Sequence, residues 1–149
     1  MAQTYFGSAL RSGSDALSDT TNGGFVVLSQ TTTVTTAAAG TATSATITLP
    51  ASSQIINFFV DMTVNEVVGA GTATTIPMTI GTAAAGTQYV SSTDVFAGGR
   101  IALSFTAAQL SAMADIGSNT SVVITLDPNG TIVTTQGVIR LTVTYAQKV

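Results

Sequence analysis

The sequence lacks histidine, cysteine and tryptophan, and only 7% of its 149 residues are charged. Without cysteine and histidine the chain cannot form disulfides, thiolate or imidazole metal sites, cysteine nucleophiles, or catalytic triads that need an imidazole base. An average soluble domain carries about 25% charged residues. These absences argue against catalytic chemistry, and we expect a protein that is not an enzyme and carries no cofactor.

Positive charge is the scarcer kind of charge in this sequence. Seven acidic residues outnumber four basic ones, and the formal net charge is -3 at pH 7. The basic residues are spread over the whole chain and are Arg11, Arg100, Arg140 and Lys148. Four scattered cations do not make the basic stripe that neutralises phosphates, so we expect no direct binding of nucleic acid.

Long hydrophobic runs are also missing. The longest aliphatic and aromatic stretch, residues 55–60, is far shorter than the roughly 20 apolar residues that cross a bilayer. The first residues show no basic stretch followed by the apolar run of a signal peptide. We therefore expect no membrane partner, and a chain that stays in the cytoplasm until assembly or lysis.

The residues that are present favour β-structure. Hydrophobic residues make up 45% of the chain, and roughly one residue in five is threonine. The mean hydropathy of +0.48 excludes a solvated, self-repelling disordered chain. Threonine, valine and isoleucine are enriched in strands, and a chain of this length fits one domain.

Apolar and polar residues alternate, as in half-buried strands, in seven segments. These are residues 25–36, 44–49, 54–64, 75–80, 100–105, 121–127 and 138–146. In the clearest segment the predicted buried face consists of Ile56, Phe58, Val60, Met62 and Val64, with Asp61 on the other face. Pro77 predicts an edge or bulged strand. The pattern predicts an all-β fold, either an antiparallel β-sandwich or a jelly roll.

One segment has a helical pattern. A Thr-x-x-Gln capping box opens residues 106–116, and Leu110, Met113 and Ile116 follow at helical spacing. We expect a short helix there, with Leu110 and Met113 packed on the core. After it, the Asp-Pro-Asn-Gly turn at residues 127–130 predicts a hairpin between residues 121–127 and a strand that begins near Thr131 or Val138.

Residues 1–24 differ from the rest because glycine and serine interrupt any regular period. We interpret them as an irregular N-terminal arm, followed by a β-sandwich domain at 25–149. The arm could lie along a neighbouring subunit, or it could be a frayed terminus. The candidate partner-binding residues of the arm are Tyr5, Phe6, Leu10 and Arg11.

Carboxylates are the only catalytic groups that the composition still allows. The candidates are Asp61, Glu66, Asp94, Asp115 and Asp127. The sequence places them on an outer strand face, in loops, late in the helix and at a turn, and it does not pair them as acid and base. No Asp-x-Asp-x-Asp-Gly series is present, so we assign no metal site and expect structural roles.

Several segments, taken in order, point to a family. They are TITLPA (46–51), IINFFV (55–60), TIGT (79–82), FTAAQL (105–110), DIG (115–117) and VTYA (143–146). Over about residues 24–147 they resemble small β-rich virion proteins of tailed bacteriophages. The resemblance implies a non-enzymatic capsid decoration or cement protein in the virion: a β-sandwich homotrimer on the outer capsid lattice that clamps adjacent major capsid proteins.

Two other functions stay open. A tail or fibre-associated domain that recognises the host surface or another virion protein would use exposed aromatics, for which Tyr89 and Phe96 are the loop candidates. An enzyme that uses acids alone would need paired carboxylates. The decoration hypothesis comes first because a nearly uncharged surface is poorly protected against association and suits a subunit of an assembly.

Overall fold

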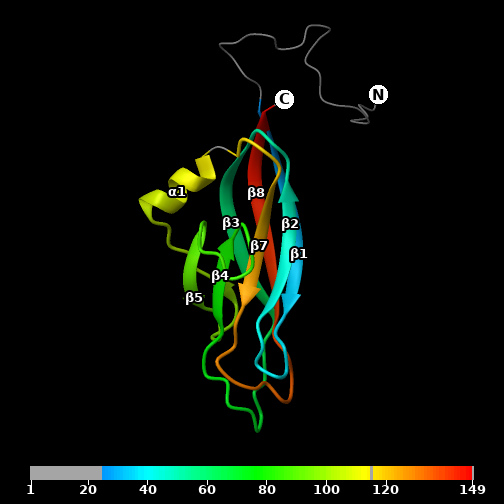
Figure 1. Ribbon diagram of the computed structural model, residues 1–149. Coiled ribbons are helices and arrows are strands. Elements are labelled where there is room, and N and C mark those ends of the chain that lie inside the picture. Colours follow the sequence, from blue (N-terminus) through cyan, green and yellow to red (C-terminus); the bar gives the residue numbers. More distant parts are fainter. Residues whose placement is uncertain (1–24, 115, 149) are drawn as a thin grey trace, which may run out of the picture.

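The structure is a computed structural model that describes residues 25–114 and 116–148. The predicted N-terminal arm, residues 1–24, lies outside the described residues, and so does Asp115. The described chain begins and ends at the same end of the molecule, because the first residue of β1 is paired with Lys148 of β8 (Figure 1).

Two antiparallel four-stranded sheets face one another (Figure 1). The first has the order β1-β8-β3-β6, with β1 (Phe25–Thr35), β8 (Val138–Lys148), β3 (Ser53–Val64) and β6 (Arg100–Ile101). The second has the order β2-β7-β4-β5, with β2 (Thr43–Leu49), β7 (Thr120–Leu126), β4 (Pro77–Gly81) and β5 (Val90–Asp94). Consecutive strands alternate between the sheets except for β4 and β5, which pair in the second, and this is the strand order of an eight-stranded jelly roll. The predicted all-β sandwich is confirmed.

The core lies between the sheets because the inward residues of the long strands are apolar. In β8, Ile139, Leu141 and Val143 have no exposed surface, and neither do Ile124 and Leu126 of β7. Each such burial stabilises the fold by about 1.5–3 kcal/mol. The same period of two sends the intervening residues of β8 to the outer side of the first sheet.

Strand β3 is bulged at two places, which corrects the prediction for two residues. Ile56 is 49% exposed and Val64 is 43% exposed. Each lies at a shift in the register between β3 and β8, where one extra residue reverses the alternation. Ile55 is buried in place of Ile56. Between the bulges the buried residues are as predicted: Phe58, Val60 and Met62.

Helix α1 (Ala107–Ala114) begins as predicted but buries a different residue. The Thr106 N–H donates to Gln109 Oε1 (2.8 Å), and the Gln109 N–H donates to Thr106 Oγ1 (3.3 Å), which is a capping box. The prediction that Leu110 packs on the core is wrong, because Leu110 is 53% exposed. Gln109 and Met113, four residues apart on one helical face, are the buried pair.

The turn at residues 127–130 does not make the predicted hairpin. Strand β7 pairs with β2 and β4, whereas the chain after the turn enters β8 in the other sheet. Asn129 Oδ1 accepts hydrogen bonds from the Thr74 N–H (2.8 Å) and the Thr75 N–H (3.0 Å), and so fixes the turn against the segment before β4. The turn therefore connects the two sheets.

Three further strand predictions need correction. Strand β4 begins at Pro77 and lies inside its sheet; the predicted irregularity is present as a register shift after Met78, but the edge position is wrong. Strand β6 contains two residues of the predicted 100–105 segment. Strand β5 has no predicted counterpart, because its sequence VSSTD shows little alternation.

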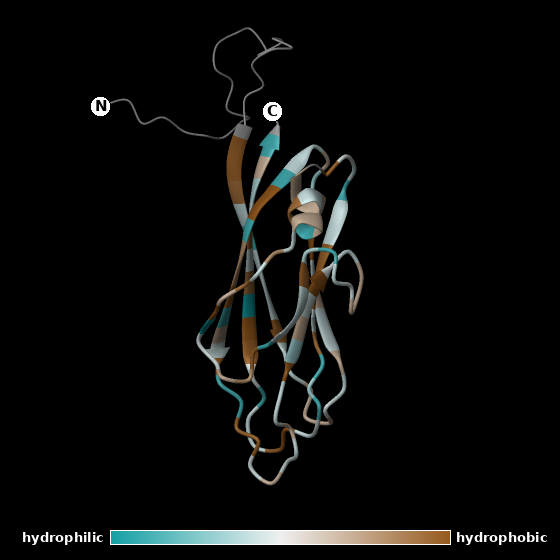
Figure 2. Cartoon of the chain, turned by 90° about the vertical axis from the view of Figure 1, so that its left-hand side faces the viewer, coloured by the Kyte–Doolittle hydropathy of each residue, from teal (hydrophilic) through white to brown (hydrophobic). Residues whose placement is uncertain are grey.

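The two sheets differ in how their outer sides are covered. The connection between β4 and β5 folds over the second sheet, where the Ala85 N–H donates to Thr125 Oγ1 (2.9 Å) and Thr125 is only 4% exposed. The outward residues of β1 from Val27 to Thr35 and of β8 from Val138 to Thr144 remain exposed or half-buried, and Ala146 is buried. Within β1 the apolar residues 25–28 give way to polar residues 29–33 (Figure 2). The outer side of the first sheet is thus open, and so is the outer side of β2, where Ser44, Thr46 and Thr48 are exposed.

Candidate functional site

Hydroxyl groups recur on the outer side of the first sheet, where Val27 and Phe59 are also exposed. Ser29 Oγ lies 3.2 Å from Thr144 Oγ1, and Thr31 Oγ1 lies 3.0 Å from Thr142 Oγ1. Residues in each pair are directly opposite in the β1–β8 register, so the sheet itself brings the hydroxyls together. We call this surface the hydroxyl face; its members are Ser29, Thr31, Thr33, Thr63, Thr142 and Thr144.

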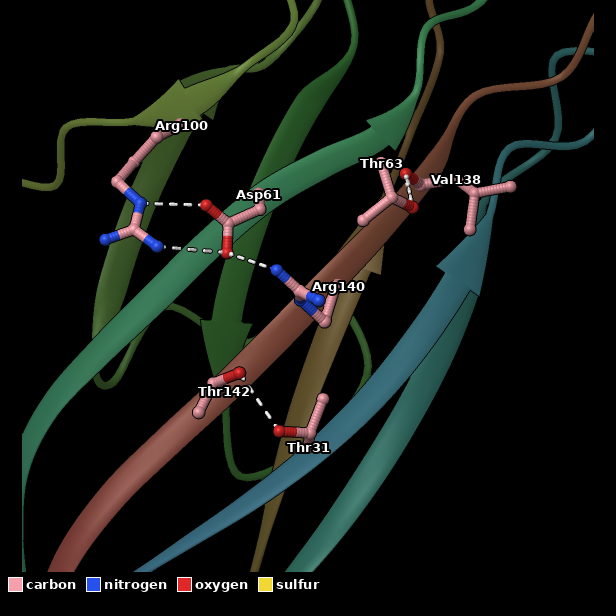
Figure 3. A network of polar contacts seen from close by, with 7 residues as sticks. All are labelled: Thr31, Asp61, Thr63, Arg100, Val138, Arg140 and Thr142. Atoms are coloured by element: carbon pink, nitrogen blue, oxygen red, sulfur yellow. Dashed lines mark hydrogen bonds and ion pairs between the residues drawn. The ribbon is translucent and has the colours of Figure 1, made fainter.

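One row of charged side chains crosses the hydroxyl face (Figure 3). Asp61 of β3 is in register with Arg100 of β6 and with Arg140 of β8. Arg100 donates through Nε to Asp61 Oδ1 (2.8 Å) and through Nη2 to Oδ2 (3.4 Å). Arg140 Nη2 donates to the same Oδ2 (3.3 Å). Two cations and one carboxylate leave this row, which we call the charged row, with a charge of +1.

The arginines cover the carboxylate. The side chain of Asp61 is 16% exposed, against 64% for Arg100 and 47% for Arg140. The hydrogen bonds from Arg100 are the main reason that the pKa of Asp61 lies below its usual value, and the carboxylate in turn raises the pKa of Arg100. A molecule that approaches this face therefore meets guanidinium groups, with the negative charge beneath them.

An aromatic ring supports the charged row. The guanidinium carbon of Arg100 lies 5.4 Å from the centroid of the Phe59 ring, within cation–π range, and Phe59 is 36% exposed. A hollow of about 220 Å³ opens beside them and is lined by Phe59, Asp61, Arg100, Arg140 and Thr142. Besides the Asp61 carboxylate, which both arginines hold, the walls of the hollow carry guanidinium, aromatic and hydroxyl groups, a set suited to a planar anionic group.

The other carboxylates do not join this row. Asp94 Oδ1 accepts hydrogen bonds from two backbone N–H groups (2.8 and 3.1 Å), which is a structural role. Glu66 Oε2 is buried and has no hydrogen-bond partner among the described residues; burial raises the pKa of Glu66. Asp127 follows β7 in the connecting turn. Within residues 25–114 and 116–148, no three Asp, Glu, His or Cys side chains form a group that could hold a metal.

The predicted contact residues of the arm are not placed by the structure. Tyr5, Phe6, Leu10 and Arg11 lie outside the described residues, so docking of the arm on a neighbouring subunit stays a prediction. The alternative interpretation, a frayed terminus, stays open for the same reason.

The two loop aromatics considered for ligand stacking are not free to stack. Tyr89 is 3% exposed, and its ring centroid lies 5.7 Å from that of Phe58. Phe96 is half-buried against the core. Phe59 is the exposed aromatic beside the site, and neither its role nor those of both arginines were predicted from the sequence. The available signal was the outward phase that Phe59 shares with Asp61, two residues later on the same strand.

Comparisons of the chain with models of known protein families, with curated proteins and with solved structures gave no match. Within residues 25–114 and 116–148, no helix is long and apolar enough to span a membrane.

Proposed function

We propose that this chain is a non-enzymatic structural protein of a bacteriophage virion, most specifically a capsid decoration or cement protein that binds the outer surface of the major capsid lattice. The observation that carries the proposal is the hydroxyl face, an open sheet surface with one charged row. Neutral hydroxyl pairs cost less to desolvate than ionised side chains, so a face of this kind can pack closely against another protein. The sequence resemblance supplies the virion context.

The fold gives secondary support. Jelly-roll sandwiches recur in viral capsid proteins and also in lectin domains, so the fold alone does not select one function. The two sheets differ in part: the β4–β5 connection covers Thr125 on the outer side of the second sheet, whereas the hydroxyl pairs of the first sheet are exposed, as are Ser44, Thr46 and Thr48 of β2. A domain with an exposed sheet face of this kind is suited to lying flat on a larger assembly.

The proposed mechanism is repetition of weak contacts. In a homotrimer, three copies of the hydroxyl face meet the shell together, and the second and third contacts form at a high effective concentration. Because the ligand is the assembled lattice, binding stabilises assembled capsid proteins relative to separated ones. The N-terminal arm, if it exchanges between subunits, adds the contacts that hold the trimer together.

The test uses purified protein, undecorated phage shells and dissociated major capsid protein. We expect a trimeric mass by light scattering, co-sedimentation with shells, little binding to dissociated capsid protein, and a rise in the temperature at which the shells disrupt. Absence of binding to shells refutes the decoration function. Binding to purified tails or to host cells instead would establish the alternative, a tail or fibre-associated domain.

A further inference from the structure

We propose that the charged row receives a carboxylate of the partner protein, so that an acidic side chain of the capsid surface contacts the two guanidinium groups from above. This inference rests on the proposed function and names the chemistry of the partner. Arg100 and Arg140 lie on opposite sides of Asp61 and are both more exposed than it is (Figure 3).

Hydrogen-bonding capacity remains at the row after the internal contacts are made. A guanidinium group has five N–H donors. Within the described residues, Arg100 bonds only through Nε and Nη2, and Arg140 only through Nη2, all to Asp61. The Nη1 groups of both arginines and Nε of Arg140 are left for an external acceptor. Because the guanidinium groups of Arg100 and Arg140 are already held by Asp61, less side-chain entropy is lost when that acceptor binds.

The surroundings of Arg100 fix its position further. The centroid of the Phe59 ring lies 5.4 Å from the guanidinium carbon of Arg100, and Asp61 accepts hydrogen bonds from Nε and Nη2 of the same guanidinium group. Thr142, which lines the same hollow and pairs with Phe59 in the β3–β8 register, is itself held by its contact with Thr31 (3.0 Å). The receptor is therefore formed before a partner binds.

The charge and the shape of the site select the ligand. A net charge of +1 balances a single carboxylate, whereas a phosphate with about two negative charges would leave the site negative. The planar fork of each arginine matches a planar carboxylate. An open surface site of this charge binds a free small acid only at millimolar concentration, so tight binding requires a carboxylate that belongs to a protein that also covers the neutral hydroxyl face.

Charge variants test the inference because they predict opposite signs. Arg140→Gln lowers the charge of the row from +1 to 0, and Asp61→Asn raises it to +2. At low salt we expect shell affinity to fall roughly fivefold or more with Arg140→Gln and to rise with Asp61→Asn. Asp127→Asn makes the same change in net charge as Asp61→Asn, at an exposed residue outside the row, and is the matched control for that variant; it should leave affinity unchanged.

The differences should shrink at high salt, where the Debye length falls to about 3 Å at 1 M. Melting temperatures of all variants control for folding. If the charged row only stabilises the structure of the face, Arg140→Gln and Asp61→Asn should both weaken binding. If both variants shift affinity in the same direction, or neither does, the carboxylate receptor is refuted while the decoration function stands.

A second experiment does not need shells. An acetylated and amidated Gly-Glu-Gly peptide, at millimolar concentration, should move the NMR signals of the Arg100 and Arg140 Nε–H groups, and the matching Gly-Gln-Gly peptide should not. Equal shifts with both peptides, or none, overturn the inference. If the wild-type chain fails to bind shells but the glutamate peptide alone shifts these signals, the proposed function fails and the receptor survives.

Discussion

Gln109 connects α1 to the β4–β5 region, and replacing it with alanine tests how the helix is held. The residue is 6% exposed. Its Oε1 accepts from the Thr106 N–H (2.8 Å), and its Nε2 donates to the Thr87 carbonyl oxygen (3.3 Å) and to Ser91 Oγ (2.9 Å). Gln109→Ala removes the helix cap contact and both bonds to the other segment at once.

The expected loss follows from these three contacts. A lost cap contact costs about 1 kcal/mol, and each lost neutral hydrogen bond costs about 1 kcal/mol. Water that enters the vacated space replaces some of the lost hydrogen bonds, so we expect a fall of about 2–3 kcal/mol in the free energy of unfolding. For a domain of this size that corresponds to a drop of about 5–10 °C in Tm.

Urea and thermal denaturation, followed by far-UV circular dichroism, measure the effect. Leu110→Ala is the matched control on the exposed side of the same helix and should change stability by less than about 0.5 kcal/mol. Gln109→Glu keeps the acceptor for the Thr106 N–H but loses the amide donor and places a carboxylate oxygen against the Thr87 carbonyl. It should therefore be at least as destabilising as alanine at pH 7. A loss with Leu110→Ala equal to that with Gln109→Ala would refute this orientation of the helix.

Three further predictions concern a half-buried acid, a tight turn and the arm. Burial raises the pKa of Glu66, so the folded state keeps the proton on this carboxyl to higher pH than the unfolded chain does. The free energy of unfolding therefore falls as the pH rises from the unfolded to the folded pKa. Glu66→Gln should raise Tm at pH 7, and the gain should vanish toward pH 4. Gly40→Ala should cost more than about 2 kcal/mol in urea denaturation, because Gly40 has φ +71 and an added Cβ would lie 2.4 Å from the Gly130 carbonyl oxygen; Gly99→Ala, with φ +75 and open space, should cost only about 1 kcal/mol. Deletion of residues 1–20 should leave the melting transition in place but abolish shell attachment or trimerisation in sedimentation and light scattering; unchanged attachment and mass would remove the arm from the proposed function.

Local signals in the sequence were enough for the class of fold and for the start of the helix. The period of two predicted the long strands, and a capping box depends on residues only three positions apart. The misplaced residues depend on distant partners. Ile56 is turned outward by a bulge that exists only in register with β8. Gln109 is buried in preference to Leu110 because Thr87 and Ser91, from another part of the chain, supply partners for its amide.

The candidate site could be predicted only in part for the same reason. The alternation in β3 correctly placed Asp61 on the outer side, but its two arginine partners lie 39 and 79 positions further along the chain. Strand order and register, which are tertiary properties, bring the three side chains into one row. A sequence pattern shows which side of a strand a charge occupies, and it does not show which charges of other strands share that side.

The low charge of the chain makes the charged row more important for the orientation of binding. A sheet face covered by neutral hydroxyls can pack against a partner in several registers, because no contact along it is much better than the next. A single charged row breaks that equivalence, since only one placement brings a partner carboxylate onto the guanidinium groups. With charged residues at only 7% of the chain, few competing charge contacts exist to favour another placement. On the proposed function, the low charge supplies a face that packs closely, and the charged row determines the orientation in which it does so.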